Sequence, residues 1–406
     1  MGGRVPGGSS ARHIAWMCAA HVISMPGFAT YSTLLPRLQQ EWGLNNSEAG
    51  FVSGAFFAGY MAAVPVLTGL TDRVDARRVY LFSCITVTLA LGAFAMLAEG
   101  LVTGALLQAA AGAGIAGTYM PGLRILTDHT AGPGQSRAVS FYTAFFGLAT
   151  SVSILQAGWI ADAWGWRAAF AVAAVGPVIA AAMVMLGMPA SHVHAQTASL
   201  LDFRPVLRVR QVWPYILGYA VHCWELFGSR AWLVAFCFFA QAAYGQGGAW
   251  IWSPVAIAAV ANLFGPPASI LGNELAIRFG RGRLIGIAMT VSGVLTCMLG
   301  FASGLPWFLI AGVAMLHMTL VMGDSSALTA GMVMHAPPQA RGATMATHSM
   351  LGFGAGFLAP LVFGAVLDVA GGNASPSAWG AAFLALGGGA VVAPWLLGFA
   401  RRGADR

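Results

Sequence analysis

The chain has 406 residues, 58% of them hydrophobic and 8% charged, with a net charge of +7 and a mean hydropathy of +0.74. Soluble domains are roughly half apolar and a quarter charged, so this chain has too few polar residues to cover a water-exposed surface. Repeated apolar stretches of about 20 residues predict helices that cross a bilayer. The composition excludes an ordinary soluble protein and indicates an integral membrane protein, with the lipid bilayer as its surroundings.

The basic residues and the cysteines exclude other classes. All 20 basic residues are arginine, and they form no basic stripe with interleaved aromatic residues, so nucleic acid is not an expected partner. The five cysteines lie in apolar stretches and include no Cys-x-x-Cys pair. We therefore expect neither a metal site nor a disulfide framework.

In chain order, the apolar stretches predict an all-α membrane protein with twelve transmembrane helices. We expect spans near residues 13–37, 47–70, 79–98, 101–126, 136–161, 167–188, 212–240, 248–275, 283–303, 306–332, 341–367 and 379–400. The longest hydrophilic stretch divides the chain near its middle. We accordingly predict three parts: an N-terminal six-helix bundle at 1–188, a central cytoplasmic loop at 189–211 and a C-terminal six-helix bundle at 212–406.

The distribution of arginine predicts the orientation in the membrane. If the N-terminus is cytoplasmic and the chain crosses twelve times, only Arg37, Arg167 and Arg230 of the 20 arginines fall outside the cytoplasmic segments. Cytoplasmic loops are enriched in arginine and lysine, so this arrangement is the favoured one. Both termini are therefore predicted to be cytoplasmic.

Short repeats indicate that a six-span unit was duplicated. The sequence DRVDARR at 72–78 is similar to IRFGRGR at 277–283, and the matching arginines lie 205 residues apart. Arg137 and Arg341 lie in similar short sequences and are separated by 204 residues. Both offsets are close to half the chain length, which predicts two parallel halves.

The span count, the central loop, the orientation and this duplication together resemble the major facilitator superfamily of secondary transporters, of the bacterial type with twelve spans. The family's loop between spans two and three reads Gly-x-x-x-Asp-Arg-x-Gly-Arg-Arg, and Asp72, Arg73 and Arg77 match it. Three positions depart from the pattern: Thr68, Asp75 and Ala76. The resemblance implies two six-helix bundles that rock about a central cavity.

The resemblance also implies that this loop latches the cytoplasmic side in the outward-facing state, by packing against the start of span eleven and the end of span four. The candidate latch residues are Asp72, Arg73, Arg77, Arg124, Asp128, Arg278 and Arg341. Asp72 is expected to accept hydrogen bonds from free N–H groups at the helix start near Arg341, and Arg77 to pair with Asp128. The alternative is that these charges are solvated and only determine topology.

Ionisable residues within spans are candidates for function because their burial in lipid is costly. Glu225 lies in span seven three residues after His222, and Asp324 lies in span ten seven residues after His317, so each acid shares a helix face with a histidine. A carboxyl group in a cavity can exchange protons with water when the cavity opens, which suits proton coupling. The alternative is a structural hydrogen bond to a neighbouring helix.

Two further basic side chains are candidates for the cavity. Arg230 lies five residues after Glu225, too far around the helix for the two to pair. It can bind an anionic group of the substrate, or extend to the membrane interface. His21 and His222 hold similar places in the two halves and can both face the cavity, although a backbone carbonyl can also satisfy a lone histidine.

The function that follows is secondary active transport of a small solute by alternating access. We predict proton-coupled uptake of a small polar or anionic metabolite, by a monomer in a bacterial inner membrane. The alternatives are proton-driven efflux of a hydrophobic or toxic compound and a non-transporting membrane sensor. No catalytic or Walker sequence is present. We therefore expect the protein to have no enzymatic activity and no cofactor, and a gradient of protons or another ion to drive transport.

Overall fold

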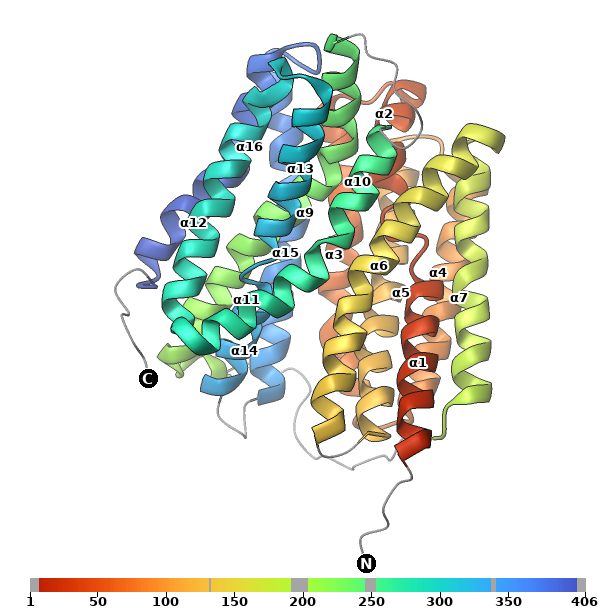
Figure 1. Ribbon diagram of the computed structural model, residues 1–406. Helices are drawn as coiled ribbons and strands as arrows, with labels where there is room; N and C mark the ends of the chain where they lie inside the picture. Colours follow the sequence, from red (N-terminus) through yellow and green to blue (C-terminus); the bar gives the residue numbers. More distant parts are fainter. Residues whose placement is uncertain (1–6, 131–132, 191–203, 245–252, 337–340, 400–406) are drawn as a thin grey trace, which may run out of the picture.

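The computed structural model describes residues 7–130, 133–190, 204–244, 253–336 and 341–399, and these residues form helices and no strand. Figure 1 shows that α1 (Gly7–Ser24) begins and α16 (Pro376–Leu396) ends at the same end of the molecule. We call this end the termini face and the opposite end, where α3 (Asn46–Leu70) begins, the far face.

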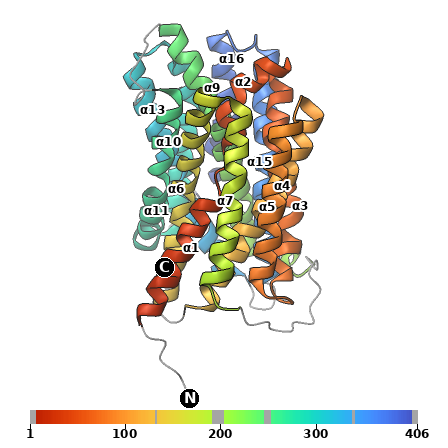
Figure 2. The same ribbon diagram turned by 90° about the vertical axis from the view of Figure 1, so that its right-hand side faces the viewer.

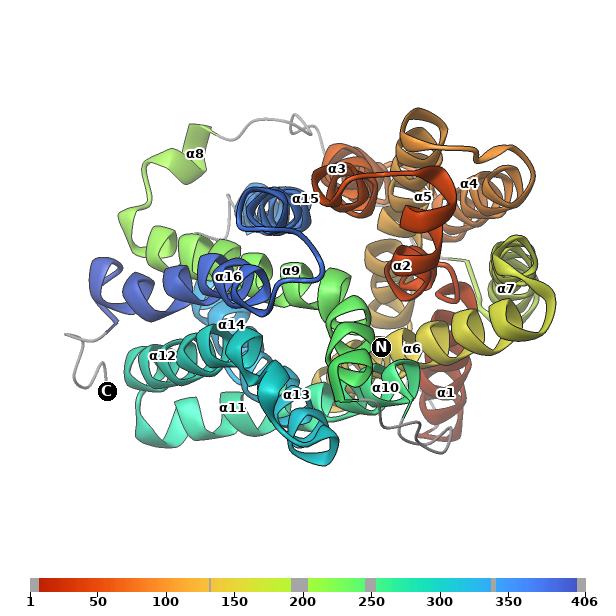
Figure 3. The ribbon, with the colours of Figure 1, turned by 90° about the horizontal axis from the view of Figure 1, so that it is seen from above.

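The remaining helices follow in two sets. The first half also contains α2 (Thr30–Trp42), α4 (Ala76–Leu97), α5 (Leu101–Asp128), α6 (Pro133–Trp164) and α7 (Trp166–Gly187). The second half also contains α8 (Arg204–Leu207), α9 (Trp213–Tyr244), α10 (Pro254–Leu263), α11 (Gly265–Phe279), α12 (Arg281–Leu299), α13 (Trp307–Val321), α14 (Ser325–His335) and α15 (Arg341–Val369). The two sets lie side by side, as the view from above shows (Figure 3). Most of the predicted central loop, residues 191–203, lies outside the described residues.

Twelve spans account for these helices, as the sequence predicts. Among the described residues, eleven segments are long and apolar enough to cross a membrane. The twelfth span consists of α1 and α2, which residues 25–29 separate; α1 lies toward the termini face and α2 toward the far face (Figure 2). Large apolar side chains such as Leu186 and Leu396 are exposed, as surfaces that face lipid require.

The break in the first span has a local cause. Pro26 lacks a backbone N–H, and Gly27 next to it has no side chain to favour the helical conformation. A Cβ atom at Gly27 would collide with the side chain of Leu91 in α4, so the chain passes close to that helix here. The single span predicted at 13–37 is therefore two helices that meet at an irregular segment.

The starts of two helices are capped by side chains that the sequence supplies locally. Asn45 accepts a hydrogen bond from the backbone N–H of Glu48 at 2.8 Å, and Glu48 accepts one from the N–H of Asn45 at 2.9 Å. This reciprocal pair is a capping box at the start of α3. Asp75 caps α4 by accepting from the N–H of Arg77 at 3.0 Å. Asp75 thus has a local structural role at a position where the family's pattern has glycine.

The two halves are joined on the far side and separate toward the termini face. One hydrophobic core contains side chains of both halves, among them Phe56 of α3 and Phe363 of α15. Nearer the termini face each half has its own core, around Tyr80 in the first half and around Ile285 in the second. The halves meet where α3 packs against α15 and where α6 packs against α10 and α11. The two halves therefore share a hydrophobic core toward the far face and have separate cores toward the termini face.

Candidate functional site

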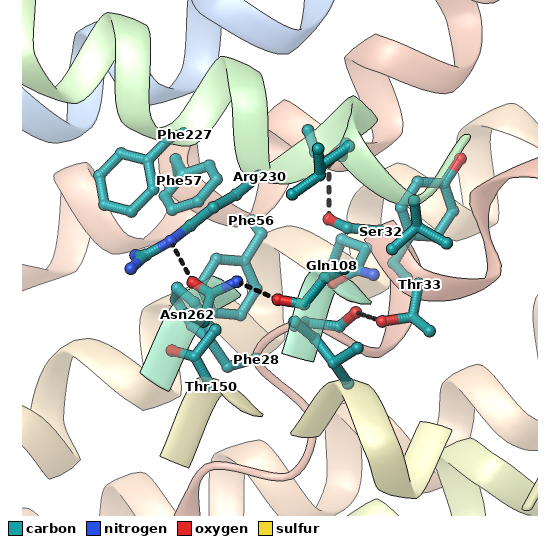
Figure 4. A pocket seen from close by; sticks show the side chains of 18 residues that line it. Phe28, Ser32, Thr33, Phe56, Phe57, Gln108, Thr150, Phe227, Arg230 and Asn262 are labelled. Atoms are coloured by element: carbon teal, nitrogen blue, oxygen red, sulfur yellow. Dashed lines mark hydrogen bonds between the residues drawn. The ribbon is translucent and has the colours of Figure 1, made fainter. Parts of the chain in front are cut away.

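A cavity of about 30 Å³ lies between the two halves (Figure 4). Helices of both halves and the break after α1 form its walls. The polar side chains that line it are Tyr31, Ser32, Thr33, Ser53, Gln108, Thr150, Arg230 and Asn262. The phenylalanines that line it are Phe28, Phe56, Phe57 and Phe227. A cavity of this size has space for one or two water molecules, so in this conformation it can hold only a small group.

The break in the first span and the start of α2 lie along this wall, and their polar groups are hydrogen-bonded. Ser153 of α6 accepts a hydrogen bond from the backbone N–H of Ala29 at 2.9 Å, which satisfies one donor that the break exposes. Thr33 donates to the carbonyl of Ala29 at 2.8 Å, and the hydroxyl groups of Ser32 and Ser53 lie 3.4 Å apart. The irregular segment therefore lines a polar cavity within the protein, the setting in which a membrane protein tolerates irregular backbone.

Arg230 of α9 is the one charged side chain among the described residues that line the cavity. Its Nε donates to Oδ1 of Asn262 at 2.9 Å, as the dashed line in Figure 4 shows, and Nδ2 of Asn262 donates to the carbonyl of Ala258 at 2.8 Å. The guanidinium carbon lies 5.9 Å from the ring centres of both Phe146 and Phe227.

Within the described part of the chain, Arg230 has no carboxylate within ion-pair distance. A partly buried cation without a counter-ion is costly, and a bound anion reduces that cost. Arg230 and Glu225 have different partners: Asn262 for Arg230, and Ser292 and Thr296 for Glu225. The alternative that Arg230 extends to the membrane interface is wrong, because the side chain lies between the halves.

Glu225 is enclosed within the second half and does not line the cavity. Its side chain is 2% exposed; Oε1 accepts from Thr296 of α12 at 2.6 Å, and Oε2 accepts from Ser292 at 3.2 Å. The hydroxyl of Thr296 also lies 3.0 Å from Nδ1 of His317 in α13. When Thr296 donates to Glu225, Nδ1 of His317 must be the donor to Thr296. A continuous hydrogen-bonded chain thus leads from His317 to Glu225.

Asp324 forms a second polar pair in the same half. Its Oδ1 lies 2.7 Å from Nδ1 of His222, and both side chains are almost completely buried. Asp324 is at the break between α13 and α14, where it takes the N-cap position of α14. Next to this pair, the ring of Tyr219 stacks between those of His222 and His348, with centroid distances of 5.6 and 3.8 Å.

The acid–histidine pairs in the structure differ from those that helical spacing predicts. His222 shares α9 with Glu225 but pairs with Asp324, and His317 precedes Asp324 but joins Glu225 through Thr296. Spacing along one helix defines a shared face, whereas the partner comes from whichever helix packs on that face. Both acids have partners on other helices, and the polar groups around them belong to the second half.

His21 does not line this cavity, although one of the two alternatives for it was a position there. It is 1% exposed in α1 and packs against the rings of Tyr119, Tyr142 and Phe146, at centroid distances of 5.3, 4.7 and 6.0 Å. Neither ring nitrogen has a hydrogen-bond partner among the described residues, so the expected backbone carbonyl partner is also missing there.

The loop between α3 and α4 carries a charge network inside the first half. Oδ1 of Asp72 lies 3.3 Å from Arg124, and Nε of Arg124 lies 2.8 Å from Asp128. Arg77 pairs with Asp75 at 2.8 Å and donates to the carbonyl of Met188 at 2.9 Å. The expected pair of Arg77 with Asp128 is therefore wrong, because each group has a nearer partner.

The other predicted latch residues are placed as follows. Arg73 lies in the same loop, and its backbone N–H donates to the carbonyl of Leu70 at 3.0 Å. Arg278 pairs with Glu274 at 2.9 Å on an exposed surface of α11. Arg341 begins α15, but its side chain and residues 337–340 lie outside the described residues. The expected contact of Asp72 with this helix start thus stays a prediction, and the described contact of Asp72 is with Arg124.

Two residues at the boundary between the halves were missed by sequence reasoning. Asn262 holds Arg230, and Asp368 at the end of α15 binds the start of α3. Asn262 is a neutral polar residue in an apolar span, and only ionisable residues were considered there. Asp368 was available as one of the 13 acidic residues, and its place near the end of a span made it resemble an ordinary loop charge.

Comparisons with known proteins agree with this arrangement. The family model of the Major Facilitator Superfamily matches residues 17–269. No curated protein matches the sequence.

Three solved structures illustrate the likeness in fold. A bacterial homologue of the human lysosomal transporter Spinster, inward-facing and unoccupied, is 14% identical with a TM-score of 0.71, over 97% of this chain and 96% of that one. The nucleoside transporter NupG is 13% identical with a TM-score of 0.73, over 97% and 99%. The human organic anion transporter MFSD10 is 14% identical with a TM-score of 0.68, over 97% and 100%. At these identities the likeness concerns the fold.

Proposed function

Since the chain belongs to the Major Facilitator Superfamily, we propose that it takes up a small anionic solute together with protons by alternating access. The observation that carries this proposal is Arg230, a cation without a carboxylate partner among the described residues, in a cavity between the two halves. A guanidinium group binds a carboxylate or a similar anion through two parallel hydrogen bonds. Its Nε is already used by Asn262, which leaves the terminal nitrogens for the solute.

The solute we propose is small and singly charged. The cavity offers one cation, several hydroxyl and amide groups and four phenylalanine rings. A second negative charge on the solute would find no second cation among the described lining residues. A short monocarboxylate matches this set, because its charge can bind Arg230 while its apolar part packs against the rings.

Proton coupling is proposed for the buried acids of the second half. Glu225 and Asp324 each have a histidine in their hydrogen-bonded surroundings, and α9 carries Glu225, His222 and Arg230 together. Movement of α9 during the transport cycle would then change the water access of both acids and the position of Arg230 at the same time. We propose that the termini face is cytoplasmic and the membrane is the bacterial inner membrane, in agreement with the arginine bias.

The experiment is solute counterflow in proteoliposomes with radiolabelled acetate, lactate, benzoate and succinate. We expect uptake of at least one monocarboxylate, and we expect Arg230→Gln to lower the initial rate about tenfold or more, since charged hydrogen bonds contribute about 1.5–3 kcal/mol. Arg167→Gln is the matched control, because Arg167 donates to the carbonyl of Ala95 and does not line the cavity. Transport that Arg230→Gln leaves unchanged would contradict the proposal.

A second measurement addresses coupling. Solute-driven proton uptake, followed with a pH dye inside the vesicles, should be lost in Glu225→Gln or in Asp324→Asn, while counterflow persists because exchange needs no net proton movement. Proton uptake that persists in both variants would exclude these acids as the coupling groups.

A further inference from the structure

Asp368, at the far-face end of α15, binds the first residues of α3 in the other half. Its Oδ1 accepts from the backbone N–H of Asn46 at 3.0 Å and from Nδ2 of Asn46 at 2.8 Å. Its Oδ2 accepts from the backbone N–H of Ser47 at 2.8 Å and from Oγ of Ser47 at 2.6 Å. One carboxylate thus makes four hydrogen bonds across the boundary between the halves. We call Asp368, Asn46 and Ser47 the far-face clasp.

The surroundings hold both sides of the clasp in place. Gln39 donates to Oδ1 of Asn46 at 2.7 Å, which directs Nδ2 of the same amide toward Asp368. A Cβ atom at Gly364, one turn before Asp368, would collide with the carbonyl of Asn46, so the two backbones touch there. The free N–H groups and the positive end of the helix dipole at the start of α3 favour a carboxylate at this position.

The clasp is positioned to be reversible. Asp368 is exposed to solvent, so water can replace its protein partners when the helices part. Hydrogen bonds to a charged group are stronger than those between neutral groups, whereas solvent access keeps the net contribution moderate. A contact with these properties can bias a conformational equilibrium without fixing it.

The antiparallel pair of α3 and α15 places an acid at each of its ends. Asp368 lies at the end of α15 and binds the start of α3, while Asp72 follows the end of α3 and lies on the same side of the membrane as the start of α15. In this structure the clasp is formed and Asp72 contacts Arg124 within its own half. At the far face an acid at the end of α15 binds the start of α3. At the termini face an acid after the end of α3 is expected to bind the start of α15.

We propose that the far-face clasp holds the far side closed while the molecule is open toward the termini face, and that it must break before the far side opens. This inference rests on alternating access as the proposed function, but not on the identity of the solute. The clasp sets how much of the population is open to the far side when no solute is bound.

The test measures the conformational equilibrium in the full chain without solute. Spin labels at Glu99→Cys and Ala374→Cys, in exposed far-face loops of the two halves, report the far-side opening by double electron–electron resonance in nanodiscs, with the five native cysteines replaced by alanine. We expect Asp368→Asn to raise the ratio of far-open to far-closed molecules about tenfold, because the charge-assisted bonds to Ser47 are lost. Ser47→Ala should shift the ratio in the same direction by less.

Glu48→Gln is the matched control. It removes an acid from the start of the same helix, but Glu48 bonds only to Asn45 of its own half among the described residues. We expect it to leave the distance distribution unchanged. A distribution that Asp368→Asn does not alter, or an equal shift in Glu48→Gln, would overturn the proposal. If Asp368→Asn does not fold, Ser47→Ala decides: a shift toward far-open supports the clasp, and an unchanged distribution overturns it.

Discussion

The two ends of the α3–α15 pair differ although the same two helices form both. At the far face, backbone touches backbone: Gly50 and Gly54 of α3 lie against the carbonyls of Pro360 and Phe357, and Asp368 adds four hydrogen bonds. Nearer the termini face, a Cβ atom at Gly354 of α15 would meet only the flexible side chain of Met61 in α3. At the far-face end, glycines allow the two backbones to touch, and hydrogen bonds of a side chain are added where the helices end.

The largest effect is expected from filling the backbone contact at the far face. In Gly50→Ala the new Cβ would collide with the carbonyl of Pro360, and backbone cannot move aside as a side chain can. Strain of about 1–3 kcal/mol should oppose far-side closure and slow transport about tenfold or more. Initial rates in proteoliposomes, corrected for the amount of inserted protein, measure this.

Gly354→Ala is the matched control for that variant. Its new Cβ would meet only the sulfur of Met61 at 3.1 Å, which a rotamer change relieves. We expect a rate within about twofold of the unaltered protein, since overpacking at a flexible side chain is mild. Equal losses of transport rate in Gly50→Ala and Gly354→Ala would contradict the inference that the two ends of the helix pair differ.

An effect of intermediate size is expected at the other end of the pair. Asp72→Asn should weaken closure at the termini face and slow turnover several-fold, because a neutral side chain caps a helix start less strongly than a carboxylate. Insertion into the membrane should be unaffected. The label pair that reports the far side should move opposite to its response in Asp368→Asn, toward far-closed. A shift in the same direction would show that the two acids do not act on opposite states.

A smaller effect, on stability instead of conformation, is expected for Arg77. Its bonds to Asp75 and to the carbonyl of Met188 connect α4 to the end of α7 within the first half. Arg77→Gln should lower the free energy of unfolding by about 1 kcal/mol, since the pair is partly exposed and screened. A thermal-shift assay in detergent would detect this as a lower Tm, with transport otherwise retained. A Tm equal to that of the unaltered protein would show that this connection contributes nothing.

The smallest effect is expected at the second copy of the loop. The side chains of Arg278 and Glu274 are 66% and 51% exposed, and a pair of that kind contributes about 0–1 kcal/mol. Arg278→Gln should therefore change neither Tm nor transport measurably. A transport defect comparable to that of Asp72→Asn would mean that the two copies of the loop still share one role.

Most of the architecture could be predicted from the sequence. Apolar stretches and arginine placement were sufficient for twelve spans, because burial in lipid allows charge only at span ends or at special interior positions. The break at residues 25–29 was not predicted, because a hydropathy pattern records the polarity of side chains but not which backbone groups are bonded. Pro26 and Gly27 were a local signal that was not used.

The candidate site could be predicted only in part. Arg230 was identified as a possible anion ligand because an arginine within an apolar span is rare and costly. Asn262 holds Arg230 in place, and His222 and His317 pair with acids on other helices. These contacts depend on which helices are neighbours, and a single sequence does not contain that information. The same holds for Asp368, whose partners lie more than 300 residues away in the chain.

The broken first span has a consequence for the biogenesis of the protein. The N–H of Ala29 is satisfied by the hydroxyl of Ser153, a group on the fifth span to be synthesised. While the chain enters the bilayer, the first span therefore carries a backbone donor that lacks this partner until four more spans have followed. Unsatisfied backbone groups are costly in hydrocarbon, so we expect the first span to reside in the insertion machinery, or at the membrane surface, until α6 arrives and completes it.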